Sequence, residues 1–271
     1  MKIVVLMKQV PDTWGERKLD TTTGWVDRVG GDNVIDEINE RALEVALSYK
    51  DSDKSAEVIV MTMAPGDVSD SLKKALAMGC DSAIHIQDDG LAGADAGMTA
   101  ATLAAALRDL NADLIVAGNE STDGRGGIVP SMIAEHLGLP HLGMLGSIDI
   151  SGSAVSGVRL IEEGTQNVHA NLPAVISVNE SNPDARFPSF KGIMGAKKKP
   201  VVTQSLADLG VSAPAGSTVI LSTSVRPARA AGTKITDDGT AGEQLADFLV
   251  SNRLIEKEQV QTCRTFSLSS N

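Results

Sequence analysis

The sequence predicts an α/β protein built around a mostly parallel, doubly wound sheet. Dense apolar runs such as "KIVVLMKQV" (2–10) and "EVIVMTMAP" (57–65) lack the alternation of a half-exposed strand, so we expect both of their faces to be buried. Helical stretches separate these runs along the chain. Strands that alternate with helices are typical of βαβ units and therefore of a parallel sheet covered on both faces.

Strand and helix alternate four times in the first half of the chain. The expected strands are 2–10, 57–65, 82–86 and 112–118. The expected helices are 39–51, 69–79, 95–110 and 128–138. The third of these helices is alanine-rich, which gives it a high intrinsic helix propensity.

The pattern of predicted elements and the composition of the sequence change past residue 145. Shorter β segments separated by turns in 147–180 predict a small antiparallel addition, from which 174–178 rejoins the main sheet. The following 203–235 is rich in small and polar residues with few charges and is poor core-forming material. One last helix is expected at 239–252. We therefore divide the chain into an α/β domain, 1–200, and an extended C-terminal arm, 201–271, which either wraps around a partner or is a simple extension.

Composition excludes several classes of protein. The 271 residues carry a net charge of −11 with a pI near 4.8, which argues against nucleic-acid binding. Cys80 and Cys263 lie far apart with no metal-type spacing, so we expect no zinc site, no disulfide framework and a cytoplasmic location. The apolar N-terminus runs into Pro11 without a cleavage site, and no stretch approaches the roughly 20 apolar residues of a membrane span.

Ligands of open parallel sheets bind beyond the carboxyl ends of the strands, and three loops leave those ends here. They are 8–15, 63–67 and 118–130. The last loop, "GNESTDGRGGIVP", leads into a helix and is rich in glycine around Arg125. Glycines allow close approach of backbone N–H groups to a phosphate, and a helix N-terminus favours negative charge. The alternative is a glycine-rich turn in which Asp123 satisfies its own backbone.

Other candidate features favour structural roles. None of the four histidines lies in a nucleophile motif with serine or cysteine, so we predict no catalytic residue, and His85 is expected in the core or at a sheet edge. Asp36 is expected to cap a helix whose first turn holds Asn39 and Glu40. Trp14 and Trp25 lie in a connection, which suggests a loop packed over a site or an interface.

The segment "FPSFKGIMGAKKKP" (187–200) stands out in an acidic chain. Its prolines and glycines make it too broken for a helix, and it has no strand alternation. We predict a shaped loop with an apolar tip at Phe187 and Phe190 and a basic base at Lys197–Lys199. Either something outside the core explains this loop, or it is merely an awkward connection.

Five stretches together resemble the beta subunit of the electron-transfer flavoprotein, most of all its actinobacterial members. They are "KQVPDT", "DEINERALEVAL", "ALAMG", "AGNESTDGRGG" and the highly specific "NPDARFPSFKGIMGAKKKP". The likeness runs from Met1 to about Gly210, with an echo in "AGTKITDDGTAGEQLADFL".

The resemblance implies a fold like that of the adenine nucleotide alpha hydrolases and a partner, the larger alpha subunit, that carries most of the FAD site. The C-terminal arm and helix would pack on this alpha subunit. The beta subunit would hold a structural AMP and have no turnover of its own. The heterodimer would collect electrons from acyl-CoA dehydrogenases and related flavin enzymes and pass them to a quinone oxidoreductase.

By the same resemblance, AMP and the flavin would contact three loops. The nucleoside part of AMP would lie against Leu6, Asp36, Glu37, Ile38, Asn39 and Met63. Its phosphate would meet Ser121, Thr122, Asp123, Gly124, Arg125, Gly126, Gly127 and Ile128. Many relatives have an acidic run or a Thr/Gln pair where this chain has Gly126 and Gly127. Backbone N–H groups must therefore contribute a larger share of the phosphate contacts than side chains do. The flavin ring would lie near Thr13 and Ile38.

The loop 184–200 corresponds to the segment that recognises client dehydrogenases in this family. The implied contacts are Pro188, Ser189, Phe190, Lys191, Gly192, Ile193 and Met194. Phe190 stands where many relatives have leucine, and a desolvated aromatic anchor suits an interaction hot spot. The FAD domain can then swing while the anchor holds, which keeps the effective concentration high. Lys197–Lys199 either steer or brace this loop, or form a solvated charge run.

Three rival interpretations remain at this level. In a bifurcating relative, a second FAD would replace AMP and take hydride from NADH. An adenine-nucleotide-binding regulatory protein, resembling universal stress proteins, would form a stable homodimer and have no use for the Phe190 loop. A hydrolase is disfavoured because the sequence lacks a nucleophile–base pair.

Overall fold

The computed structural model describes residues 1–212, 218–225, 227–229 and 231–255. The chain divides into two compact units, Met1–Ser224 and a second one that begins at Val225. The first unit contains the sheet, and each unit is described by itself below.

The first unit is built on a nine-stranded sheet in the order β11-β5-β4-β1-β6-β10-β7-β8-β9. All strand pairs from β11 to β7 are parallel, and β7-β8 and β8-β9 are antiparallel. The strands are β1 (Lys2–Met7), β4 (Glu57–Met63), β5 (Ser82–Ile86), β6 (Leu114–Gly118), β7 (His141–Ile150), β8 (Ala154–Ile161), β9 (Gly164–Asn171), β10 (Ala174–Val178) and β11 (Val201–Gln204). A separate antiparallel ribbon pairs β2 (Gln9–Pro11) with β3 (Asn33–Ile35).

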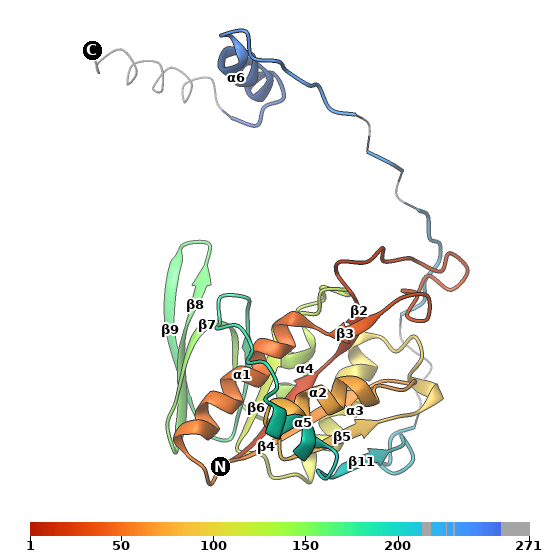
Figure 1. Ribbon diagram of the computed structural model, residues 1–271, viewed down its shortest axis with the longest axis vertical. Coiled ribbons are helices and arrows are strands. Elements are labelled where there is room, and N and C mark those ends of the chain that lie inside the picture. The colour runs from red at the N-terminus through yellow and green to blue at the C-terminus, as the bar shows by residue number, and fades with distance from the viewer. Residues whose placement is uncertain (213–217, 226, 230, 256–271) are drawn as a thin grey trace. The chain divides into compact units, whose positions relative to one another are not determined.

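Helices cover both faces of the parallel part (Figure 1). One core joins the sheet to α1 (Glu37–Ser52), α2 (Ser69–Met78) and α5 (Phe190–Ala196). The other joins it to α3 (Ala96–Arg108) and α4 (Val129–Leu137). Alternate residues of β1 enter opposite cores, which explains why its sequence is apolar without interruption. A short 3₁₀ helix, η1 (Asp89–Leu91), precedes α3. The predicted doubly wound α/β fold is confirmed.

Local signals determine where the helices begin and end. The Asp36 side chain accepts a hydrogen bond from the backbone N–H of Ile38, as expected for the N-cap of α1. Helix α4 ends at Gly138, whose φ of 65° is the left-handed conformation that glycine adopts without strain. His85 is buried in β5 with its ring Nε2 3.2 Å from the Ala64 carbonyl oxygen, which agrees with the predicted core position.

The antiparallel addition is also confirmed. β7, β8 and β9 form the outer edge of the sheet (Figure 1), and β10 inserts between β6 and β7 with both pairings parallel. The segment 174–178 therefore rejoins the main sheet as predicted.

The prediction that 187–200 is too broken for a helix is wrong, because residues Phe190–Ala196 form α5. Ser189 supplies the N-cap and accepts a hydrogen bond from the Gly192 N–H at 3.1 Å. Glycine also has a packing role here, since a Cβ on Gly192 would lie 2.1 Å from the Ala77 carbonyl oxygen. Close contact with α2 thus stabilises a helix that local propensity disfavours. Figure 1 shows α5 beside α2.

The sheet-bearing unit extends beyond residue 200, where the sequence analysis set the boundary. β11 pairs in parallel with β5, and Leu206 is buried in the α3/α4 core. The last predicted helix is α6 (Ala241–Ser251), in the second unit. Cys80 is buried, and Cys263 lies outside the described residues. No helix in the described ranges is both long and apolar enough to traverse a bilayer.

Candidate functional site

The strand order reverses at β1. From β1 the chain builds outward through β4 and β5, and β6 and β10 then extend the sheet on the other side. The connections that leave the carboxyl ends of β1 and β6 therefore begin side by side and lead to opposite faces. This arrangement is a topological switch point, the place where open α/β sheets bind ligands.

Asp36 joins the two connections at this point. Its Oδ2 atom accepts hydrogen bonds from the Thr122 backbone N–H at 2.6 Å and from the Thr122 hydroxyl at 2.8 Å. The Asp36 side chain is fully buried, and its Oδ1 caps α1. Asp36, predicted from the sequence as a helix cap and by resemblance as a nucleotide contact, therefore also holds the loop after β6.

A second carboxylate, Asp123, lies between two cations from the connection that follows β1. Lys8 Nζ is 2.8 Å from one carboxylate oxygen, and an Arg28 guanidinium nitrogen is 2.5 Å from the other. Burial by itself would raise the pKa of Asp123, but hydrogen bonds and the positive charge of Lys8 lower this pKa well below its usual range. Asp123 also accepts from the Gly124 N–H at 2.7 Å, as the structural alternative predicted.

Arg17 adds a further link between the loops. Its guanidinium donates to the Thr122 carbonyl oxygen at 2.6 Å and to the Thr122 hydroxyl at 2.8 Å, and also to the Pro11 carbonyl. Trp25, in the same connection, packs so closely on Gly93 that a Cβ there would lie 2.2 Å from the indole ring. Trp14 is 97% exposed. The connection is thus a packed loop with one free aromatic side chain.

Asn39 occupies the space beside the end of β6. Its side-chain oxygen accepts from the Lys8 backbone N–H at 2.7 Å, and a Cβ on Gly118 would lie 2.4 Å from its side-chain nitrogen. Only glycine fits at position 118 with this geometry. The buried Asn119 side-chain oxygen, one residue further on, has no hydrogen-bond partner within the described part of the chain.

The other predicted contacts differ in accessibility. Leu6 and Ile38 are buried in the two cores, and Met63 is half-buried at the end of β4. The exposed residues are Thr13, Glu37, Gly124, Arg125, Gly126, Gly127 and Ile128, and Ser121 is half-buried. The structure brings Asp36, Asn39 and 121–124 together through shared hydrogen bonds. Of the two predicted flavin contacts, Thr13 is exposed and Ile38 packs against Gly118.

Sequence reasoning did not select Lys8, Arg17 or Arg28. Lys8 had an available signal, since it directly follows β1 in a loop already identified as a strand end. Arg17 and Arg28 belong to a long connection whose path the sequence does not reveal. No group of three or more metal-binding side chains occurs among the described residues.

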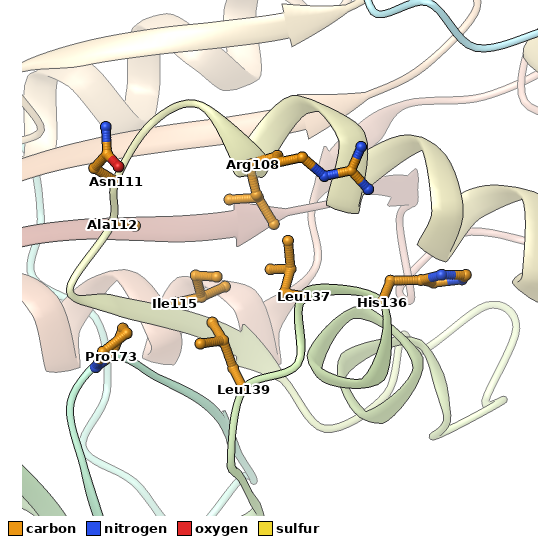
Figure 2. Close-up of a pocket in the computed structure, with 9 residues that line it drawn as sticks. Arg108, Asn111, Ala112, Ile115, His136, Leu137, Leu139 and Pro173 are labelled. Carbon is orange, nitrogen blue, oxygen red and sulfur yellow. The ribbon is translucent and has the colours of Figure 1, made fainter.

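A pocket of about 400 Å³ lies away from this site (Figure 2). It is formed by the C-terminal ends of α3 and α4 together with Ala112, Ile115 and Pro173. These residues lie at the amino-terminal side of β6 and β10, whereas the switch point lies at the carboxyl ends. The pocket is therefore separate from the charged loops.

The α5 surface is the second notable region. Phe187 and Phe190 are 94% and 81% exposed, and Ile193 and Met194 are at least half exposed. We call these four side chains the α5 patch. Large apolar groups gathered on one short segment are typical of an interaction surface.

The strand order and its switch point define a doubly wound α/β protein. The family described as "Electron transfer flavoprotein domain" matches residues 23–209. The electron transfer flavoprotein subunit beta of Mycobacterium tuberculosis is 48% identical over 264 residues, covering 93% of this chain and 99% of that protein. The subunit of the same name from Syntrophomonas wolfei is 35% identical, covering 94% and 98%. The caffeyl-CoA reductase-Etf complex subunit CarD of Acetobacterium woodii is 36% identical, covering 95% and 99%.

The chain belongs to the electron transfer flavoprotein family, as a protein of the beta-subunit type that serves in electron transfer. The resemblance drawn from its sequence motifs is thereby confirmed.

Proposed function

We propose that the chain pairs with a larger alpha subunit and that the heterodimer shuttles electrons from acyl-CoA dehydrogenases to a quinone oxidoreductase. The alpha subunit would contribute most of the FAD site. This chain would bind AMP at the switch point between β1 and β6 and support the flavin from the 11–33 connection. The observation that carries the proposal is the set of hydrogen bonds and ion pairs through which Asp36 and Asp123 join the two switch-point loops.

The residues at the switch point fit an adenine nucleotide. Helix α4 has no side-chain cap and follows Gly126 and Gly127, so its N-terminal N–H groups suit a phosphate. A ribose hydroxyl or the adenine amino group would supply the donor that the buried Asn119 oxygen lacks among the described residues. Lys8 and Arg28 are already paired with Asp123, so backbone donors carry most of the phosphate binding.

FAD, when bound, supplies the one- and two-electron chemistry. This chain would help to position the flavin and would dock the dehydrogenase. The α5 patch would present Phe190 to a dehydrogenase as an apolar anchor. No catalytic side chain is needed for this role. We place the complex in the cytoplasm, which suits a chain whose described cysteine is unpaired and buried.

The test is co-expression with the candidate alpha subunit, followed by acid release and chromatography of the bound nucleotides. One FAD and one AMP per heterodimer supports the proposal. A complex that holds neither nucleotide contradicts it.

A matched pair of variants locates AMP. A Cβ on Gly126 has no heavy atom within 4 Å, so a side chain fits there. Gly126→Asp places a negative charge beside the phosphate and should remove AMP, whereas the neutral Gly126→Asn should retain it. If both variants keep AMP, the phosphate lies elsewhere.

The second candidate is a bifurcating subunit in which a second FAD replaces AMP and NADH is the donor. The glycine-rich loop 118–130 could admit the adenosine end of either nucleotide, and the buried Asn119 oxygen would accept a hydrogen bond from either. The same chromatography separates the two candidates, because this one requires two FAD and no AMP.

A further inference from the structure

The chain segment that leads into α5 is fixed to α1 by an arginine. The Arg186 guanidinium donates to both Glu44 carboxylate oxygens at 2.8 Å, and the Arg186 backbone N–H donates to the same carboxylate at 3.0 Å. A third guanidinium nitrogen is 2.8 Å from an Asp51 oxygen. The planar fork of arginine suits such bidentate pairing, and a lysine could not reproduce it.

The same segment has a second attachment to α1. Arg41 is 2.6 Å from Asp184 and also donates to the Asn182 carbonyl oxygen. The buried Asn182 side chain in turn donates to the Leu145 carbonyl oxygen at 2.7 Å. The backbone is therefore held on both sides of Ala185, which itself packs against the core.

The other end of α5 is fixed to α2. Lys199 Nζ donates to the carbonyl oxygens of Leu76 at 2.8 Å and Cys80 at 2.5 Å. Leu76 lies in the last turn of α2 and Cys80 directly follows the Gly79 C-cap, so Lys199 places a positive charge at the helix C-terminus, where it is favourable. Lys199 is thus distinct from Lys198, which is exposed.

Between these attachments α5 itself contributes little to the core. Ala196 is its one buried residue, while the α5 patch faces outward. A helix of this length is marginal in isolation, so its conformation depends on the close contact of Gly192 with Ala77 and on what fixes its ends.

We propose that Arg186 and Lys199 are positioning residues that hold α5 preformed for docking to the electron-donating flavin dehydrogenase. The proposal rests on the proposed function, since it assigns that role to the α5 patch. Preorganisation increases affinity by removing the entropy cost of ordering the segment during association. The residues do not touch the dehydrogenase or the flavin.

The first test needs no dehydrogenase. Hydrogen exchange of the amides in 190–196 is measured in the heterodimer for Arg186→Lys, Lys199→Met and the matched control Lys198→Met. We expect exchange to accelerate about tenfold in the first two variants and to stay unchanged in the control. Unchanged exchange in both variants, or equal acceleration in the control, would overturn the proposal.

The second test separates docking from chemistry. With an acyl-CoA dehydrogenase as electron donor, Arg186→Lys should raise the KM for the heterodimer about tenfold and leave kcat within about twofold, because only association is weakened. A fall in kcat with unchanged KM would overturn the positioning role.

The variant Phe190→Ala distinguishes failure of the positioning proposal from failure of the proposed function. If Phe190→Ala leaves the KM unchanged while Arg186→Lys still accelerates exchange, the attachments are real and the docking role of the patch is wrong. If Phe190→Ala raises the KM and Arg186→Lys changes neither exchange nor KM, docking stands and the positioning proposal is overturned.

Discussion

The loops at the switch point and the α5 surface belong to the same unit but are built in opposite ways. At the switch point, the Asp123 carboxylate is turned inward, with its side chain only 1% exposed, and is paired with the partly exposed Lys8 and Arg28. On α5, charged residues hold the ends of the segment while apolar side chains face outward. The first region is held together by a buried carboxylate and its partners, whereas the second exposes apolar side chains as an interaction surface does.

This difference teaches how the two regions should respond to mutation. Removing a buried charge leaves its partners uncompensated, which costs folding free energy. Removing an exposed apolar group costs the folded chain little, and the loss appears only when the partner binds. The predictions below test this separation, from the largest expected effect to the smallest.

Asp123→Asn should lower the free energy of unfolding by about 3 kcal/mol, because Lys8 and Arg28 lose their common partner. Urea denaturation of the purified protein measures this change. Asp149→Asn, at an exposed position of β7, serves as the control and should change stability by less than about 0.5 kcal/mol. Equal effects of the two substitutions would contradict the inward pairing.

Phe190→Ala should reduce kcat/KM for electron transfer from an acyl-CoA dehydrogenase about thirtyfold, equivalent to about 2 kcal/mol. FAD content and unfolding free energy should not change, because the side chain is 81% exposed. Phe187→Ala is the matched control on the same patch, with a smaller expected effect. Loss of FAD together with activity would indicate an assembly defect instead.

Thr122→Val should lower the free energy of unfolding by about 1 kcal/mol. The substitution preserves shape but removes the hydroxyl that donates to Asp36 and accepts from Arg17. The backbone hydrogen bond from residue 122 to Asp36 remains, which limits the loss. A cost as large as that of Asp123→Asn would show that the hydroxyl, and not the backbone, holds this loop.

The smallest expected effect concerns pH: the contribution of Asp123 to the free energy of unfolding should not change between pH 8 and 5. The folded-state pKa of Asp123 lies below the unfolded value of 3.8, so the carboxylate is ionised in both states throughout that range. Its stabilisation is fully present above pH 3.8 and declines as the pH falls through the lower folded-state pKa. Acid titration of unfolding should therefore bring the wild type and Asp123→Asn closer together only below about pH 4.

The sequence predicts the repetitive parts of this fold well. The four βα units follow from apolar runs such as 57–65 and from helices with clear amphipathic spacing, since each signal is contained within its own segment. The N-cap role of Asp36 was likewise predictable from its place before the helix.

The errors occur where a distant contact decides the local structure. α5 forms because Gly192 lies against the Ala77 carbonyl and Lys199 reaches the end of α2, and neither contact can be read from 187–200 alone. The roles of Arg17 and Arg28 depend on how the 11–33 connection folds back over the loop after β6. Propensity and periodicity do not report such long-range geometry.

The environment of Cys80 has a consequence for an electron carrier. Burial raises the pKa of this thiol to about 12, so essentially no thiolate is present at physiological pH. Only a thiolate attacks disulfides or oxidises readily, and Cys80 is also closed off from solvent. Among the residues that the structure describes, thiol chemistry therefore offers no side route for electrons.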